Sequence, residues 1–224
     1  MRQPRSFHPP EPSLGSSRRD ALAEARLYLC TPSRPDLREF LHAAYEGGVD
    51  IIQLRDKGID ARKEIEAVEV LAEVAAEHGK LFSVNDRADV AALVDADIFH
   101  VGQGDLTSAQ ARALLGDDVI IGRSNNSTEM FKDSLNDVHL DYAVIGPVWE
   151  TPTKPGRKAV GTETIRQAAE LTAISDNPWF AIGGIDEERM PEVLRAGAQR
   201  VVVVRAITEA RDPEEAARLL RSML

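Results

Sequence analysis

Residues 51–79 read IIQLRDKGIDARKEIEAVEVLAEVAAEHG and set out the unit from which we predict the fold. The unit begins with the apolar run Ile51–Leu54, which is short and rich in β-branched residues, as expected of a strand buried on both faces. A polar turn follows, and Ala61–His78 then places apolar residues at helical spacing, between Asp60 as the expected N-cap and Gly79 as the expected stop. A strand followed by a loop and an amphipathic helix is the repeating unit of parallel α/β folds.

Apolar runs of this kind recur along the whole chain, with helical patterns between them. Eight strands, each followed by a helix, predict a single-domain (β/α)8 barrel, whereas the rival open doubly wound sheet more often has about five or six strands. The eight predicted strands are Leu27–Cys30, Ile51–Leu54, Leu81–Val84, Ile98–Val101, Val119–Ile121, Tyr142–Ile145, Trp179–Ile182 and Val201–Val204, and the other predicted helices are Ser108–Leu115, Thr162–Ala173, Glu187–Ala196 and Pro213–Arg221.

The composition limits the classes of protein that fit. The chain has 224 residues, a hydrophobic content of 43% and a net charge of −10, which give no sign of a nucleic-acid surface. No apolar run approaches the length that spans a bilayer. The single cysteine, Cys30, excludes an intrachain disulfide and fits a cytoplasmic location.

The first residues carry proline, serine and basic residues without periodicity. We therefore expect a disordered leader over residues 1–18 and a catalytic barrel over residues 19–224, with a transit peptide as the alternative for the leader. Barrels of this size often associate, and the sequence leaves the oligomeric state open.

The strand ends carry the polar residues that point to function, because reactive side chains of such barrels lie there. Gln53, Arg55 and Lys57 alternate along the end of the second strand and therefore share one face. Two cations and an amide at the barrel mouth suit a phosphate or pyrophosphate ligand. The alternative is a solvated strand end with an internal Arg55–Asp56 pair.

Two aspartates follow neighbouring strands at the same mouth. Asp86 lies directly after the third strand, next to Asn85, and Asp105 follows the fourth. Two carboxylates beside a phosphorylated ligand suit Mg²⁺, which prefers oxygen ligands. The alternative is that each aspartate caps the helix that follows it.

The remaining strand ends carry weaker signals. Ser124 offers a hydroxyl to a ligand but also fits an ordinary turn. The loop 150–156 is long for its position, which indicates either an anion-binding loop or a plain proline-rich one. Gly184 allows close approach of the backbone where these barrels often bind phosphate. We find no Ser–His–Asp arrangement, and we interpret His100 as a buried, hydrogen-bonded side chain.

Taken together, the strand ends resemble those of the thiamine-phosphate synthase family. The matching stretches occur in the same order as in the family and cover nearly the whole chain from Leu27 to the C-terminus. Each stretch alone is a weak signal, but the ordered set is specific. They are Gln53-Leu54-Arg55-Asp56-Lys57, Asn85-Asp86-Arg87, His100-Val101-Gly102-Gln103 with Asp105, Gly122 with Ser124, Asp141-Tyr142 with Gly146-Pro147, Thr151-Pro152-Thr153-Lys154, Ala181-Ile182-Gly183-Gly184-Ile185, and Val204 with Ala206-Ile207.

The resemblance implies a transferase that joins 4-amino-2-methyl-5-(diphosphooxymethyl)pyrimidine to 4-methyl-5-(2-phosphooxyethyl)thiazole, or to its carboxylated form. The products are thiamine phosphate and diphosphate, and the mechanism is dissociative. The resemblance assigns Mg²⁺ to Asp86 and Asp105. It assigns the pyrimidine diphosphate to Gln53, Arg55, Lys57, Asn85, Ser124 and Lys154, and the thiazole phosphate to Thr151, Thr153, Gly184, Val204 and Arg205.

Two positions depart from the family pattern. Arg205 stands where the family usually has serine, and its guanidinium would either add a phosphate contact or displace the backbone donors. Asn126 stands where the family often has histidine. The related thiazole phosphate tautomerase depends on a histidine in that loop, so Asn126 argues against this enzymatic alternative. A barrel that binds thiamine phosphate without turnover is the non-enzymatic alternative, and Arg205 keeps it open.

Overall fold

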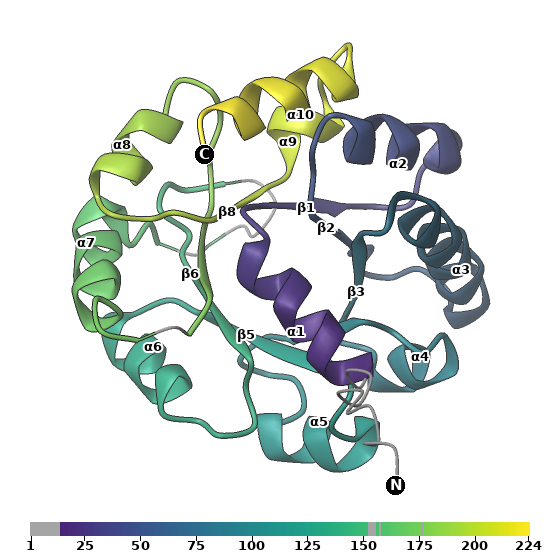
Figure 1. Ribbon diagram of the computed structural model, residues 1–224, viewed down its shortest axis with the longest axis horizontal. Coiled ribbons are helices and arrows are strands. Elements are labelled where there is room, and N and C mark those ends of the chain that lie inside the picture. The colour runs from purple at the N-terminus through teal and green to yellow at the C-terminus, as the bar shows by residue number, and fades with distance from the viewer. Residues whose placement is uncertain (1–13, 152–155, 157, 176) are drawn as a thin grey trace, which may run out of the picture.

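The computed structural model describes residues 14–151, 156, 158–175 and 177–224. Within them, parallel strands pair in sequence order and close into a barrel, and helices form a ring outside it (Figure 1). The predicted (β/α)8 barrel is confirmed. Its strands are β1 (Leu27–Thr31), β2 (Ile51–Leu54), β3 (Leu81–Asn85), β4 (Ile98–Val101), β5 (Ile120–Asn125), β6 (Tyr142–Ile145), β7 (Trp179–Ile182) and β8 (Val201–Val203).

Each of the five predicted helices is present, and the described residues contain further helices that the sequence analysis did not name. The helix predicted from Glu187 begins only at Met190, because the Asp186 carboxylate accepts the backbone N–H of Arg189 and holds a preceding turn. The helices are α1 (Leu14–Glu24), α2 (Leu37–Glu46), α3 (Ala61–His78), α4 (Ala88–Leu93), α5 (Ser108–Leu115), α6 (Thr128–Leu135), α7 (Gly161–Leu171), α8 (Met190–Arg195), α9 (Arg205–Thr208) and α10 (Pro213–Ser222). No helix in the described ranges has the length and hydropathy that crossing a membrane requires.

Side chains of each strand alternate between the helix layer and the barrel interior. On β2, Ile52 and Leu54 pack in the cluster under the helices, whereas Ile51 belongs to the interior cluster. Ile98 of β4 and Ile120 of β5 join the same interior cluster near the amino ends of their strands. The next inward positions of these strands are polar or lack a side chain, so the interior changes from apolar to polar towards the carboxyl ends.

Helix α1 covers the amino ends of the strands and crosses the centre of the ring in Figure 1. Leu22 packs into the interior cluster, and Nε of Arg18 donates to Oδ1 of Asp97 at 2.8 Å. Residues 14–18 are therefore helical, and the expected disordered leader does not extend over them. The reason is a set of contacts that join residues far apart in sequence, which a local pattern does not reveal. Residues 1–13 of that expected leader lie outside the described residues.

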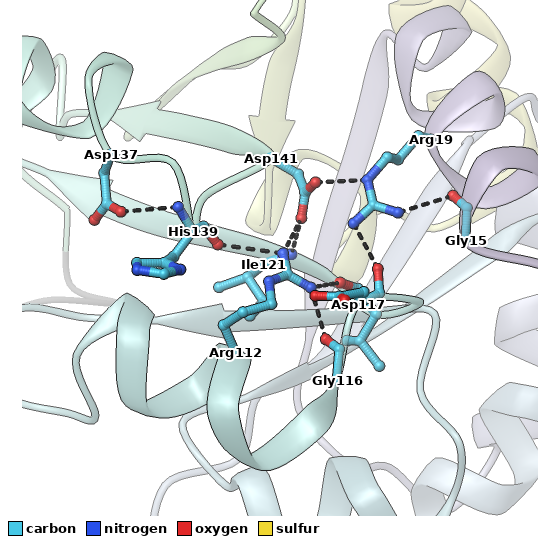
Figure 2. A network of polar contacts seen from close by, with 10 residues as sticks. Gly15, Arg19, Arg112, Gly116, Asp117, Ile121, Asp137, His139 and Asp141 are labelled. Carbon is cyan, nitrogen blue, oxygen red and sulfur yellow. Dashed lines mark hydrogen bonds and ion pairs between the residues drawn. The ribbon is translucent and has the colours of Figure 1, made fainter.

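A second set of polar contacts, made by the next residue of α1, fixes the helix against the amino ends of β5 and β6 (Figure 2). Nε of Arg19 donates to Oδ1 of Asp141 at 2.7 Å, and the other oxygen of this carboxylate accepts from Arg112 at 2.7 Å and from the Ile121 backbone at 2.8 Å. The Asp141 side chain is only 13% exposed. The network lies at the amino ends of the strands, so it stabilises the barrel without contributing side chains to the carboxyl ends.

Candidate active site

Of the cavities at the mouth of the barrel, by which we mean the carboxyl ends of the strands and the loops after them, three share a lining residue. The first, of about 250 Å³, includes Lys57, Asp86 and Asp105. The second, of about 210 Å³, lies between the ends of β6, β7 and β8. A smaller one of about 40 Å³ includes Gln53 and reaches the barrel interior. Ser124 lines all three, so they form one continuous site.

The first cavity pairs a cation with two carboxylates. Nζ of Lys57 lies 3.2 Å from Oδ2 of Asp86. Asp105 accepts the backbone N–H of Gly102 through Oδ2 at 2.8 Å. Asp86 has a φ of 62°, a left-handed conformation that is uncommon for aspartate, and its backbone N–H donates to the His100 carbonyl at 3.0 Å. The local backbone therefore turns Asp86 towards the mouth at the cost of some strain.

The two carboxyl groups are close enough to hydrogen-bond to each other, which confirms that the strand ends bring them together. Burial favours a higher pKa of Asp86, but its hydrogen bonds with Asp105 and Lys57 outweigh burial and lower that pKa. Desolvation and the adjacent Asp86 raise the pKa of Asp105. Asp86 is therefore the more acidic of the two groups, and a cation bound between them would favour the ionised form of both.

The donor set fits Mg²⁺ better than a metal held by protein alone. Among the described residues, no group of three or more histidine, cysteine, aspartate or glutamate side chains could hold a metal ion. Asp86 and Asp105 would therefore supply two oxygen ligands and leave the rest to water and a substrate phosphate. Mg²⁺ is commonly bound in this way.

Gln53 and Arg55 lie on the same inward face, as their spacing predicts. The Gln53 side chain is buried, and Nε2 donates to Oη of Tyr28 at 2.8 Å and to Oγ of Ser83 at 3.3 Å. Cys30 donates through Sγ to Oε1 of Gln53 at 3.4 Å. The Arg55 side chain lines the first cavity and has no ion pair with any described residue. The hydrogen-bonded amide of Gln53 and the guanidinium of Arg55 thus face the same small cavity.

Asn85 and Ser124 complete this half of the site. Asn85 is buried beside Asp86 and hydrogen-bonds to its carboxylate. Oγ of Ser124 lies 2.8 Å from Nε2 of His100, and Nδ1 of the same ring lies 2.9 Å from Oη of Tyr142. The expectation that His100 is buried and hydrogen-bonded is confirmed. The contact between His100 and Ser124 was not predicted. The third member of the group is the phenol of Tyr142, whereas a Ser–His–Asp arrangement would have a carboxylate there.

The second cavity is lined by residues of the loops after β6, β7 and β8. Thr151, Gly184 and Val204 all border it. Gly184 has a φ of 69°, and a Cβ placed there would lie 3.0 Å from Cβ of Trp149. A side chain at this position would therefore be strained and crowded, which leaves the backbone N–H groups open to a ligand.

The sequence of the chain decides the family. The sequence profile of the family described as Thiamine monophosphate synthase matches residues 27–207. The chain belongs to this family. Its relatives include a thiamine-phosphate synthase from Streptomyces avermitilis, 56% identical over 202 residues that cover 89% of this chain and 93% of the relative. Another, from Thermobifida fusca, is 54% identical over 209 residues, with 92% and 95% covered.

A solved structure agrees with this assignment. Thiamine phosphate pyrophosphorylase from Pyrococcus furiosus superposes with a TM-score of 0.80 and 32% identity, over 92% of this chain and 96% of that one. Membership of the thiamine monophosphate synthase family makes the chain a transferase of thiamine biosynthesis.

The two positions that depart from the family pattern, Arg205 and Asn126, are both exposed. Arg205 is exposed at the start of α9, lines the second cavity, and has no ion pair with a described residue. Asn126 is exposed in the loop after β5. Thr153 and Lys154 lie outside the described residues. Tyr142 was missed because a tyrosine within an apolar run looks like core, and the only signal was its hydroxyl at an inward position.

Proposed function

We propose that this transferase joins 4-amino-2-methyl-5-(diphosphooxymethyl)pyrimidine to 4-methyl-5-(2-phosphooxyethyl)thiazole, or to its carboxylated form, and releases thiamine phosphate and diphosphate. The observation that carries the proposal is that a pocket with two acids and two cations adjoins a second pocket bordered by glycine backbone and Arg205, with Ser124 between them. Such a site accommodates two phosphorylated molecules with their reacting ends adjacent. The names of the relatives support thiamine phosphate as the product.

The first pocket is the proposed site of the pyrimidine diphosphate. Arg55 and Lys57 would pair with its phosphates, because guanidinium and ammonium groups both bind phosphate strongly. Asp86 and Asp105 would hold Mg²⁺ against the same phosphates. When bound, this ion neutralises charge on the leaving diphosphate. Ser124 and the amides of Gln53 and Asn85 would orient the substrate, and Lys154 is proposed from the family pattern alone.

The second pocket is the proposed site of the thiazole phosphate. Gly184 and Val204 would offer backbone N–H groups, and Thr151 would offer a hydroxyl. Arg205 would pair with the phosphate through its exposed guanidinium. Thr153 is assigned to this group by the family pattern.

The proposed reaction needs no proton transfer. The bond between the pyrimidine methylene carbon and the diphosphate oxygen breaks, and both electrons leave with diphosphate. The lone pair of the thiazole nitrogen then forms a bond to the methylene carbon. The protein has to neutralise the leaving group through Arg55 and Lys57 and to hold the two partners in line. This mechanism uses the cations and amides of the site directly and assigns its two carboxylates, Asp86 and Asp105, to Mg²⁺, so that neither is required as a general base.

A comparison of substrate requirements tests the proposal. The chain is incubated with Mg²⁺ and the pyrimidine diphosphate, a thiazole phosphate, or both, and products are separated by chromatography. The proposal predicts thiamine phosphate only with both substrates. Isomerisation of a thiazole tautomer without the pyrimidine would indicate the tautomerase instead, and calorimetric binding of thiamine phosphate without any turnover would indicate a binding barrel.

The remaining partners and the location are proposed on general grounds. A net charge of −10 supports small molecules rather than nucleic acid as partners, and the presence of a single cysteine in the sequence, which excludes an intrachain disulfide, supports a cytoplasmic location. A homo-oligomer fits the habit of barrels of this size.

A further inference from the structure

Five polar side chains form a continuous path of hydrogen bonds across the barrel interior, which we call the interior relay. Nε2 of Gln53 donates to Oη of Tyr28 at 2.8 Å, and this hydroxyl lies 3.3 Å from Oη of Tyr142. Oη of Tyr142 lies 2.9 Å from Nδ1 of His100, and Nε2 of His100 lies 2.8 Å from Oγ of Ser124. The relay therefore connects Gln53 on β2 with Ser124 on β5.

The side chains of the relay are buried below the mouth. Its members are between 1% and 7% exposed, with Tyr28 at 1% and His100 at 7%. Buried polar groups are costly unless every one of them is hydrogen-bonded, so a fully connected set specifies one arrangement of its members. Apolar residues at these inward positions would fill the barrel without that requirement. Packing alone therefore does not account for the relay.

The barrel omits a side chain to make room for the relay. Gly122 lies on β5 directly opposite Tyr142 in the register of β5 and β6. A Cβ on Gly122 would lie 2.1 Å from ring atoms of Tyr142. Its backbone conformation is not one that only glycine adopts, so the absence of a side chain serves the tyrosine ring rather than a turn.

The number of protons in the relay limits its arrangement. Burial raises the pKa of Tyr28 and of Tyr142, so each phenol keeps its single proton at neutral pH. One arrangement that satisfies every contact has Gln53 donating to Tyr28, Tyr28 donating to Tyr142, and Tyr142 donating to Nδ1 of His100. A neutral ring then carries its proton on Nε2 and donates it to Ser124. The Ser124 hydroxyl keeps its own proton for an acceptor in the mouth, such as a phosphate oxygen.

We propose that Tyr28, Tyr142 and His100 are positioning residues that hold the Gln53 amide and the Ser124 hydroxyl in one fixed donor–acceptor arrangement. This inference rests on the proposed function, in which Gln53 and Ser124 bind the pyrimidine diphosphate. The relay makes the two groups a single unit, although they come from strands that do not neighbour each other, β2 and β5. It stabilises the orientation of each group before substrate arrives, which is how supporting hydrogen bonds usually assist a binding site.

The variant Tyr142→Phe tests the relay, because it removes only the central hydroxyl and keeps the ring over Gly122. The matched control is Tyr45→Phe, in which the lost hydroxyl is equally buried but donates to the Leu81 carbonyl outside the site. For Tyr142→Phe we expect KM for the pyrimidine diphosphate to rise about tenfold, the loss of roughly one well-formed hydrogen bond. KM for the thiazole phosphate stays within about twofold. The control changes neither KM by more than about twofold.

A spectroscopic readout separates positioning from general loss of stability. In ¹⁵N-labelled enzyme the relay predicts a single Nε2–H tautomer of the His100 ring, and Tyr142→Phe removes that preference while Tyr45→Phe preserves it. Tyr28→Phe is the second variant, and it should raise KM for the pyrimidine diphosphate in the same way if Tyr142→Phe does not fold. Kinetics and tautomer like those of the control in both folded variants would overturn the inference.

The failure of the relay can be distinguished from the failure of the proposed site. Gln53→Ala and Ser124→Ala remove the groups that would contact substrate. If these variants lose activity while Tyr28→Phe and Tyr142→Phe match the control, the proposed site stands and the relay falls. If Gln53→Ala and Ser124→Ala retain wild-type kinetics, the proposed site itself falls, and the inference falls with it.

Discussion

The ammonium group of Lys57 lies 3.2 Å from the carboxylate of Asp86, at the point where β2 and β3 end side by side. Burial is the largest single effect on Asp86 and favours a higher pKa. The hydrogen bonds with Asp105 and Lys57 act in the opposite direction, and together they lower the pKa of Asp86. Lys57 thus helps to keep the Asp86 carboxylate ionised. The Lys57 side chain is itself exposed enough to turn to a ligand. In the proposed complex, the substrate diphosphate would pair with Lys57 in place of Asp86, and the Asp86 carboxylate would then be available to bind Mg²⁺.

Replacing Lys57 by alanine should lower kcat/KM for the pyrimidine diphosphate by on the order of a hundredfold, because a charge-assisted contact to phosphate is lost. Steady-state kinetics with the pyrimidine diphosphate varied at saturating thiazole phosphate measure the effect. The control is Lys132→Ala, an exposed lysine on α6 outside the mouth. Equal kinetics of the two variants would remove Lys57 from the site.

Magnesium binding should weaken as the pH falls, because the pKa of Asp105 is raised and its protonated form is not a ligand. Above that raised pKa, the affinity for Mg²⁺ should be constant. Below it, each unit of pH should lower the affinity by about tenfold, since one proton is taken up for each ion released. Calorimetric titration with Mg²⁺ over a series of pH values measures this. Asp105→Ala should bind weakly with no such slope, and a wild-type affinity in that variant would refute the metal assignment.

Arg205→Ser restores the residue that the family usually has at this position and tests what the arginine contributes. If Arg205 pairs with the thiazole phosphate, KM for that substrate should rise about tenfold while KM for the pyrimidine diphosphate is unchanged. Arg211→Ala serves as the control, because this arginine is exposed between α9 and α10 and lines neither pocket. A lower KM in Arg205→Ser would mean that the arginine obstructs the backbone donors.

Arg112→Ala should lower the free energy of unfolding by about 3 kcal/mol, because it leaves the mostly buried Asp141 carboxylate without one of its two cations. Denaturant titration measures the loss, and kcat per folded molecule should not change because the network lies at the opposite end of the barrel. Arg218→Ala breaks only exposed ion pairs on α10 and should change stability by less than about 1 kcal/mol. Similar stabilities of the two variants would argue against a structural role for the network.

The sequence was sufficient to predict features that depend only on local residue patterns and on the order of the strands. The barrel followed from eight apolar runs, and the inward face of Gln53 followed from strand alternation, since a strand shifted by one residue would bury its other face. The proximity of Asp86 and Asp105 followed from the order of neighbouring strands. These features need no knowledge of contacts between distant residues.

Features that depend on distant contacts were missed. Helix α1 was interpreted in part as disordered leader because its segment is polar, and the ion pair of Arg18 with Asp97 that holds it joins residues 79 positions apart. The relay was missed because Tyr28 and Tyr142 occur in apolar runs, where their rings fit the core. Only the closed barrel shows that their hydroxyls meet each other and His100.

The most direct test of the account is synthesis from the two precursors by the purified chain. With Mg²⁺, the pyrimidine diphosphate and the thiazole phosphate, we predict thiamine phosphate and diphosphate in equal amounts, and removal of Mg²⁺ by a chelator should suppress both. Recovery of both precursors intact, with no thiamine phosphate at any Mg²⁺ concentration, would contradict it.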